Sequence, residues 1–121
     1  MRTRVKFCGL TRVEDIHSAV QVGVDALGFV LYPKSKRALS LLQACQLRSH
    51  VPALIDIIAL VVNPTVAEVQ AIIKDLKPHA IQFHGDESPE FCEQFNYPYW
   101  RAVRVGAPEL ETEQEIADYV A

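Results

Sequence analysis

Five short segments rich in β-branched and aromatic residues recur along the chain, and a stretch with helical character follows each of them. Their interiors are almost continuously apolar, which is typical of strands covered by helices rather than of a sheet with one wet face. The repeat therefore predicts a parallel α/β sheet. The five segments are RVKFC (4–8), ALGFVLY (26–32), IIALVV (57–62), AIQFH (80–84) and YWRAVRV (99–105).

The starts of the intervening helices carry a second repeated signal. A Ser or Thr followed three residues later by Glu or Gln predicts a capping box, in which each residue satisfies a backbone N–H of the other. Ser88 before Pro89 predicts a fifth start, because proline at the first helical position lacks the N–H that would stay unpaired. The four predicted capping boxes are Thr11/Glu14, Ser40/Gln43, Thr65/Glu68 and Thr112/Glu115.

Composition limits the functional classes. The chain has 121 residues, half of them apolar, and a formal net charge of −3, as expected of one compact domain and not of a nucleic-acid binder. No apolar run suggests a secretory signal or a membrane span, so we expect a cytoplasmic protein. Three cysteines without a C-x-x-C pair predict reduced thiols rather than a disulfide framework or a zinc site.

Two architectures compete. The length favours a five-stranded, doubly wound open sheet, because a closed eight-stranded barrel usually takes about 250 residues. Polar residues within the strands favour a barrel interior or a ligand cleft: Lys6, Gln82 and Arg101 interrupt apolar runs. Side chains alternate along a strand, so Lys6 shares a face with Cys8, and Gln82 shares one with His84. Charged edges of an open sheet remain the alternative for Lys6 and Arg101.

Ligands of parallel α/β proteins bind where strands end, which directs attention to residues at those positions. A thiolate at Cys8 would gain from the following helix dipole and nearby cations, although a lone cysteine is more often a small buried hydrophobe. The loop 32–40 holds Lys34, Lys36 and Arg37 and could bind a carboxylate or phosphate, or could be a solvated turn. The strand-end candidates are Cys8, residues 32–40, Asn63, residues 82–87 and Arg104.

Other chemistries lack their motifs. The segment HGDE (84–87) matches no common metal-ligand spacing, and Gly85 marks a turn, so no metal is expected there. The sequence contains no G-x-S-x-G, P-loop or G-x-G-x-x-G, which leaves serine hydrolases, NTPases and dinucleotide enzymes without support.

Several stretches together resemble the phosphoribosylanthranilate isomerase family of tryptophan biosynthesis. They are KFCGLT, DALGFVLYPKSKRALS, ALVVNP, IQFHGDE and WRAVRV, in order along the chain. The resemblance implies a (β/α)₈ barrel that carries out an Amadori rearrangement of N-(5-phosphoribosyl)anthranilate to an aminodeoxyribulose phosphate, without metal or organic cofactor. It implies that Cys8 is the general base for the C2′ proton and that Arg37 binds the anthranilate carboxylate. Gln82 and His84 match the substrate pocket of the fourth strand.

The resemblance also implies parts that lie beyond this sequence. Family members have roughly 200 residues, like other small barrels, whereas this chain ends at Ala121, before the expected sixth strand, its general acid and the phosphate-binding loops. No acidic residue present, Asp118 included, matches that acid. We therefore expect residues 1–121 to form the amino-terminal part of a single barrel domain, with about five βα units and little activity alone.

The open edges of such a part would favour self-association or pairing with a C-terminal half. The rival hypothesis is a non-catalytic, doubly wound binding or receiver-like domain. A receiver-like domain would carry clustered acidic residues at the end of the first strand, where this chain has Cys8 and Gly9.

Overall fold

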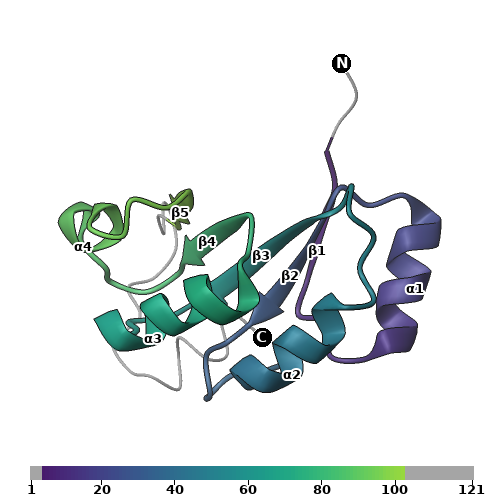
Figure 1. Cartoon of the computed structure of the whole chain (residues 1–121), viewed down its shortest axis with the longest axis horizontal. Coiled ribbons are helices and arrows are strands. Elements are labelled where there is room, and N and C mark those ends of the chain that lie inside the picture. Colours follow the sequence, from purple (N-terminus) through teal and green to yellow (C-terminus); the bar gives the residue numbers. More distant parts are fainter. Residues whose placement is uncertain (1–3, 103–121) are drawn as a thin grey trace, which may run out of the picture.

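The computed structural model of the chain describes residues 4–102, in which strands and helices alternate (Figure 1). All five predicted segments contain a strand, although residues 103–105 of the fifth lie outside the described residues. The element η1 is a π-helical turn that continues α3. The elements are β1 (Lys6–Cys8), α1 (Val13–Val22), β2 (Ala26–Val30), α2 (Leu41–Arg48), β3 (Asp56–Val61), α3 (Val66–Ala71), η1 (Ile72–Leu76), β4 (Ala80–Phe83), α4 (Pro89–Glu93) and β5 (Tyr99–Arg101).

The strands form one parallel sheet in the order β1-β2-β3-β4-β5, so every strand pairs with its neighbour in sequence. The register places Cys8 opposite Gly28, Leu60 opposite Gln82, and Gln82 opposite Trp100. A doubly wound sheet reverses its strand order at a switch point, whereas a barrel wall keeps sequence order. The observed order is that of a barrel wall.

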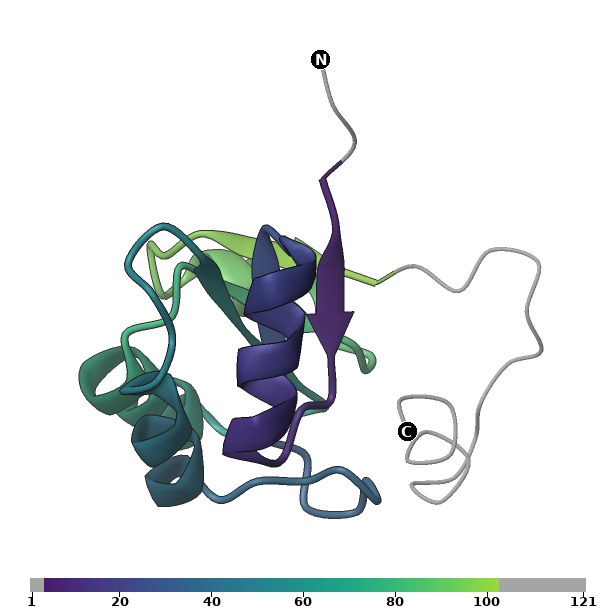
Figure 2. The same ribbon diagram turned by 90° about the vertical axis from the view of Figure 1, so that its right-hand side faces the viewer.

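The helices all cover one face of this sheet (Figure 2). The large core cluster joins residues of all four α-helices to alternate strand residues, among them Leu27, Phe29, Ile57, Ile81 and Phe83. Among the described residues, the opposite face is filled by strand and strand-end side chains in two clusters: Val30, Tyr32, Leu60 and Val62 with Cys8 against them, and Ala26, Ile58 and Ala80. Of the segments described, no helix is long and apolar enough to cross a membrane.

The sheet is curled so strongly that the first strand touches the fourth and fifth across its inner face. Lys6 Nζ on β1 donates a hydrogen bond to Gln82 Oε1 on β4 and lies 5.4 Å from the ring centroid of Trp100 on β5. Neighbouring strands lie about 4.8 Å apart, so a flat sheet would separate β1 from β4 by roughly 14 Å. This contact requires barrel curvature, and the preference for an open sheet drawn from chain length is wrong.

Three of the predicted helix starts are confirmed. Ser40 Oγ accepts from Gln43 N at 3.1 Å while Gln43 Oε1 accepts from Ser40 N at 2.8 Å, and Thr65 and Glu68 repeat the pattern at 3.1 and 2.9 Å. Ser88 Oγ accepts from Phe91 N at 3.1 Å, with Pro89 beginning α4.

The capping box predicted for Thr11 and Glu14 is wrong. Helix α1 begins one residue later, with Arg12 extended at the cap position and no side-chain cap bond. Arg12 instead forms an ion pair with Asp15 at 3.0 Å, which lowers the pKa of Asp15 chiefly through their hydrogen bond. The fourth pair, Thr112/Glu115, lies outside the described residues.

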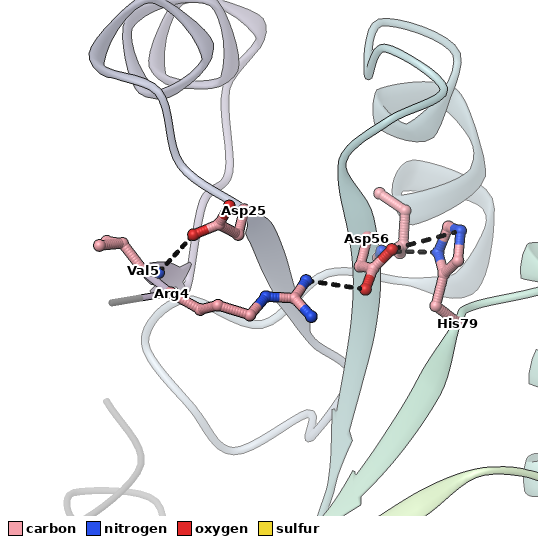
Figure 3. A network of polar contacts seen from close by, with 6 residues as sticks. Arg4, Val5, Asp25, Asp56 and His79 are labelled. Atoms are coloured by element: carbon pink, nitrogen blue, oxygen red, sulfur yellow. Dashed lines mark hydrogen bonds and ion pairs between the residues drawn. The ribbon is translucent and has the colours of Figure 1, made fainter. Parts of the chain in front are cut away.

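At the amino ends of the strands, polar side chains supply partners that the short strands lack (Figure 3). Val5 N donates to Asp25 Oδ2 at 2.7 Å, and Arg4 Nη2 lies 3.3 Å from Asp56 Oδ2. His79, the residue before β4, accepts a hydrogen bond at Nδ1 from the backbone N of Ile57 at 2.8 Å. The imidazole therefore replaces a strand acceptor at the edge of the ladder.

We predict that His79→Ala lowers the free energy of unfolding by about 1–3 kcal/mol, because the backbone N–H of the buried Ile57 loses its acceptor. Urea titration followed by circular dichroism measures the loss. The matched control is His17→Ala, which removes an exposed imidazole from α1. Equal losses in the two variants would contradict the role assigned to His79.

Candidate active site

The sequence candidates at the strand ends gather at one edge of the curled sheet, because the carboxyl ends of parallel strands lie together. Cys8 is the last residue of β1, Arg37 lies in the loop after β2, Asn63 follows β3 and His84 follows β4. Arg104, the remaining candidate, lies outside the described residues.

The thiol of Cys8 is half-buried on the inner face and packs against the cluster of Val30 and Leu60. Directly opposite it in the register is Gly28. A Cβ at Gly28 would lie 2.8 Å from Cys8 Sγ and 3.1 Å from Lys6 Cε, so only glycine leaves room for both side chains. The side chain of Cys8 therefore points into the interior of the curled sheet and not into the core beneath the helices.

The guanidinium of Arg37 lies directly over Gly9. A Cβ at Gly9 would lie 2.6 Å from Arg37 Cζ, and its φ of +83° is one that L side chains rarely adopt. Arg37 Nη1 donates to the backbone O of Cys8 at 3.2 Å, so the Cys8–Gly9 pair seats the guanidinium. The structure therefore brings together two predicted site residues that are 29 positions apart.

The loop that carries Arg37 is folded rather than open. Ser35 is buried and its Oγ accepts from the backbone N of Arg37 at 3.2 Å. Leu39 N donates to Val30 O at 2.8 Å, which ties the end of the loop to β2. Lys34 and Lys36 are exposed, whereas Arg37 is half-buried and held against the site.

Lys6 and Gln82 confirm the prediction that polar strand residues face the interior. Their mutual hydrogen bond and the nearby face of Trp100 hold the ammonium of Lys6 inside the curled sheet. Burial lowers the pKa of Lys6, and the negative charge of a Cys8 thiolate opposes that lowering. The alternative of a solvated sheet edge is wrong for Lys6.

The same prediction is wrong for Arg101. The register pairs it with Phe83, whose ring belongs to the core beneath the helices, so Arg101 lies on the outer face of the sheet. There its Nε donates to the backbone O of Glu87 at 3.2 Å. Alternation from Trp100, which faces Lys6, explains the difference, because adjacent strand residues point to opposite faces.

Glu87 belongs to the predicted candidate segment 82–87, but its role is structural, which the sequence did not predict. Its buried carboxylate accepts from the backbone N of Asn63 at 2.7 Å through Oε2 and from that of Gly85 at 2.9 Å through Oε1. Asn63 Oδ1 in turn accepts from Asp86 N at 2.9 Å. These bonds fasten the loop after β3 to the loop after β4. Within residues 4–102, no group of three or more His, Cys, Asp or Glu could hold a metal ion.

His84 sits directly beside this fastened pair of loops. Its backbone N donates to Val61 O at 2.9 Å, which continues the β3–β4 ladder one residue past the strand. Alternation therefore puts the imidazole on the same face as Gln82. The backbone of His84 is thus held by its hydrogen bond to Val61, and the loop that follows it is held by the hydrogen bonds of Glu87.

A family model described as N-(5'phosphoribosyl)anthranilate (PRA) isomerase matches residues 5–120. The chain belongs to this family. A relative named N-(5'-phosphoribosyl)anthranilate isomerase from Bordetella bronchiseptica is 54% identical over 117 residues, which cover 97% of this chain and 54% of the relative. One of the same name from Legionella pneumophila strain Corby is 48% identical over 102 residues, covering 84% and 49%.

Solved structures of the family share the fold. Phosphoribosyl anthranilate isomerase from Thermotoga maritima has a TM-score of 0.81 at 34% identity, over 84% of this chain and 51% of that one. A structure in complex with reduced 1-(o-carboxyphenylamino)-1-deoxyribulose 5-phosphate has a TM-score of 0.81 at 30% identity, over 98% and 59%. The sheet of this chain is thus a partial (β/α)₈ barrel, and the chain spans about half the length of the curated relatives it matches.

We predict that Glu87→Ala lowers the free energy of unfolding by about 2–3 kcal/mol, because two loop N–H groups lose a charged acceptor. Urea titration measures the change. Glu90→Ala, at an exposed position on α4, is the control and should cost well under 1 kcal/mol. A loss at Glu87 no larger than at Glu90 would show that the loops are held by other contacts.

Proposed function

We propose that this chain supplies the general base and the anthranilate-binding residues of a phosphoribosylanthranilate isomerase. The reaction is the Amadori rearrangement of N-(5-phosphoribosyl)anthranilate to 1-(2-carboxyphenylamino)-1-deoxyribulose 5-phosphate in tryptophan biosynthesis. The observation that carries the proposal is the seating of Arg37 over Gly9 with a bond to the carbonyl of Cys8. It supports a site in which a carboxylate-binding group and a thiol stand next to each other.

Cys8 is the proposed base. Ring opening of the substrate gives an iminium, whose positive nitrogen acidifies the neighbouring C2′–H bond and favours a thiolate beside it. The proton passes to the sulfur of Cys8, and the electron pair of the C2′–H bond becomes the C1′–C2′ double bond as the nitrogen becomes neutral. Addition of a proton to C1′ and loss of the proton of the C2′ hydroxyl then give the ketose. The proposed reaction needs no metal or organic cofactor.

Arg37 is the proposed anchor of the anthranilate carboxylate. A guanidinium presents two parallel N–H donors that match the two oxygens of a carboxylate, which a lysine ammonium does not reproduce. The side chains of Gln82 and His84, on the same inner face, are proposed to line the substrate pocket. Gln82 contributes through its bond to Lys6, and His84 through its position at the end of β4.

The general acid and the phosphate site are proposed to come from βα units beyond those described. Residues 1–121 would then be the amino-terminal part of a single barrel domain that a C-terminal half completes. In the described part β1 pairs only with β2 and β5 only with β4. Phe7 is 38% exposed and Trp100 is 50% exposed, which supports a surface that the remaining units cover. The three free cysteines fit a reducing, cytoplasmic location.

A complementation assay tests this proposal. The chain is mixed with the C-terminal segment of the Bordetella bronchiseptica relative that lies beyond its matched 117 residues. Loss of phosphoribosylanthranilate fluorescence then measures turnover. We predict turnover in the mixture, and a rate at least 10²-fold lower when the chain carries Cys8→Ala, as expected for removal of a general base.

Sedimentation of the chain alone and of the mixture gives the matching association data. A one-to-one complex with turnover supports completion by a C-terminal half. Turnover by a dimer of the chain alone would identify a second copy as the completing unit. Full activity of the mixture with Cys8→Ala would overturn the assignment of the base.

We predict that Arg37→Lys in the same mixture raises KM at least tenfold, equivalent to about 1.4 kcal/mol, with a smaller effect on kcat. A lysine keeps the charge but loses the two-point contact with the carboxylate. Initial rates at varied substrate concentration separate the two constants. Arg48→Lys, in the last turn of α2, is the matched control. An unchanged KM would exclude Arg37 as the carboxylate anchor.

A further inference from the structure

Lys6 and Cys8 stand side by side on the inner face of β1. Both side chains pass through the space that Gly28 leaves empty on β2: Lys6 Cε lies 3.1 Å and Cys8 Sγ 2.8 Å from the point a Cβ of Gly28 would occupy. The terminal ammonium of Lys6 contacts Gln82 on β4 and the face of Trp100 on β5. The ammonium is therefore kept inside the curled sheet rather than extended into solvent.

The partners that hold Lys6 are neutral, which leaves its charge to be balanced. A half-buried ammonium loses hydration, and an amide oxygen and an indole face offset only part of that cost. Asp25, which precedes β2 and accepts from Val5 N at 2.7 Å, lines a cavity together with Lys6. The other charged residue on the inner face of the described strands is Asp56, at the amino end of β3, which lines the same cavity. It is already engaged with Arg4 at 3.3 Å and lies 3.7 Å from His79 Nε2. The sulfur of Cys8 is the group beside Lys6 that can carry the balancing negative charge.

Four titratable or charged groups lie around Cys8 in the described part of the chain. Lys6 lies beside it on β1, and Arg37 binds its carbonyl from the loop after β2. Tyr32 belongs to the cluster against which Cys8 packs, and His84 follows β4 on the same inner face as Gln82. Arg37 bonds the backbone O of Cys8 rather than its sulfur, and a bound carboxylate would offset its charge. Lys6 is the cation that keeps its charge next to the sulfur with the substrate in place.

We propose that Lys6 is a positioning residue whose ammonium holds Cys8 in the thiolate form that removes the substrate proton. The thiolate itself is a property of this pair of residues, and its use on the C2′ proton rests on the function proposed above. The direction of the electrostatic coupling agrees, since a negative Cys8 raises the pKa of Lys6 against the effect of burial.

The test measures the reactivity of Cys8 directly and requires no turnover. The full 121-residue chain reacts with iodoacetamide from pH 5 to 9.5. After a timed quench, peptide mass spectrometry gives the alkylation rate of each cysteine. The variants are Lys6→Met, which removes the charge, Lys6→Arg, which keeps it, and Lys74→Met, which makes the same change in net charge on an exposed helix position.

We expect Lys6→Met to slow the alkylation of Cys8 about tenfold at pH 7 and to move its pH profile upward, because the thiolate loses the neighbouring cation. Lys6→Arg should restore most of the rate, and Lys74→Met should leave it unchanged. Cys45 is the internal control, since burial raises its pKa and Lys6 is not among the groups that shift it. Cys92, 1% exposed, reports unfolding.

A Cys8 rate and pH profile that do not change in Lys6→Met would overturn the proposal. So would a loss in Lys6→Arg as large as in Lys6→Met, because the charge would then not be the cause. If Lys6→Met exposes Cys92 to alkylation, the same comparison is made with Lys6→Gln, which is neutral but still able to hydrogen-bond Gln82. Failure of the proposed isomerase activity would appear only in the complementation assay and leaves this result intact.

Discussion

The curvature of the sheet is the constraint on which the rest of this structure depends. In the part of the chain that the structure describes, all four α-helices cover the outer face, and the inner face is filled by strand and strand-end side chains. The curvature brings β1 close to β4 and β5, so the interior that those side chains must fill is narrow. Small and branched residues occupy it at the amino end of the strands, where Ala26, Ile58 and Ala80 meet.

Polar side chains lie among these apolar residues of the interior, because Lys6 is level with Ala26 and Cys8 packs against the cluster of Val30 and Leu60. Lys6 bridges from β1 to Gln82, and Cys8 stands two residues further along the same face. Because Gly28 lacks a side chain, the two reach the same space without a clash. A larger residue at position 28 would fill this space with apolar atoms and separate the ammonium from the sulfur. The glycine on a neighbouring strand is thus as much a part of the site as the thiol.

The strands, three helix starts and the inward orientation of Lys6 and Gln82 could be predicted from the sequence, because each depends on a local pattern. Sequence reasoning failed where a residue's role depends on another part of the chain. Arg101 faces the helices because the register, which the sequence does not state, pairs it with Phe83. Glu87 holds two loops that meet only when β3 and β4 are adjacent. Thr11 and Glu14 have the spacing of a capping box, but α1 begins one residue later, with Arg12 at the cap position and paired with Asp15.

At the end of β1 a cysteine is followed directly by a glycine, and the two residues have linked structural roles. The thiol must end the strand to stand at the open rim of the barrel, and the chain must then turn away toward α1. A positive φ at Gly9 makes this turn, and the missing side chain leaves the surface on which Arg37 rests. Any other residue at position 9 would strain the turn and also displace the guanidinium from the carbonyl of Cys8. The two adjacent residues therefore fix the distance between the proposed base and the proposed carboxylate anchor.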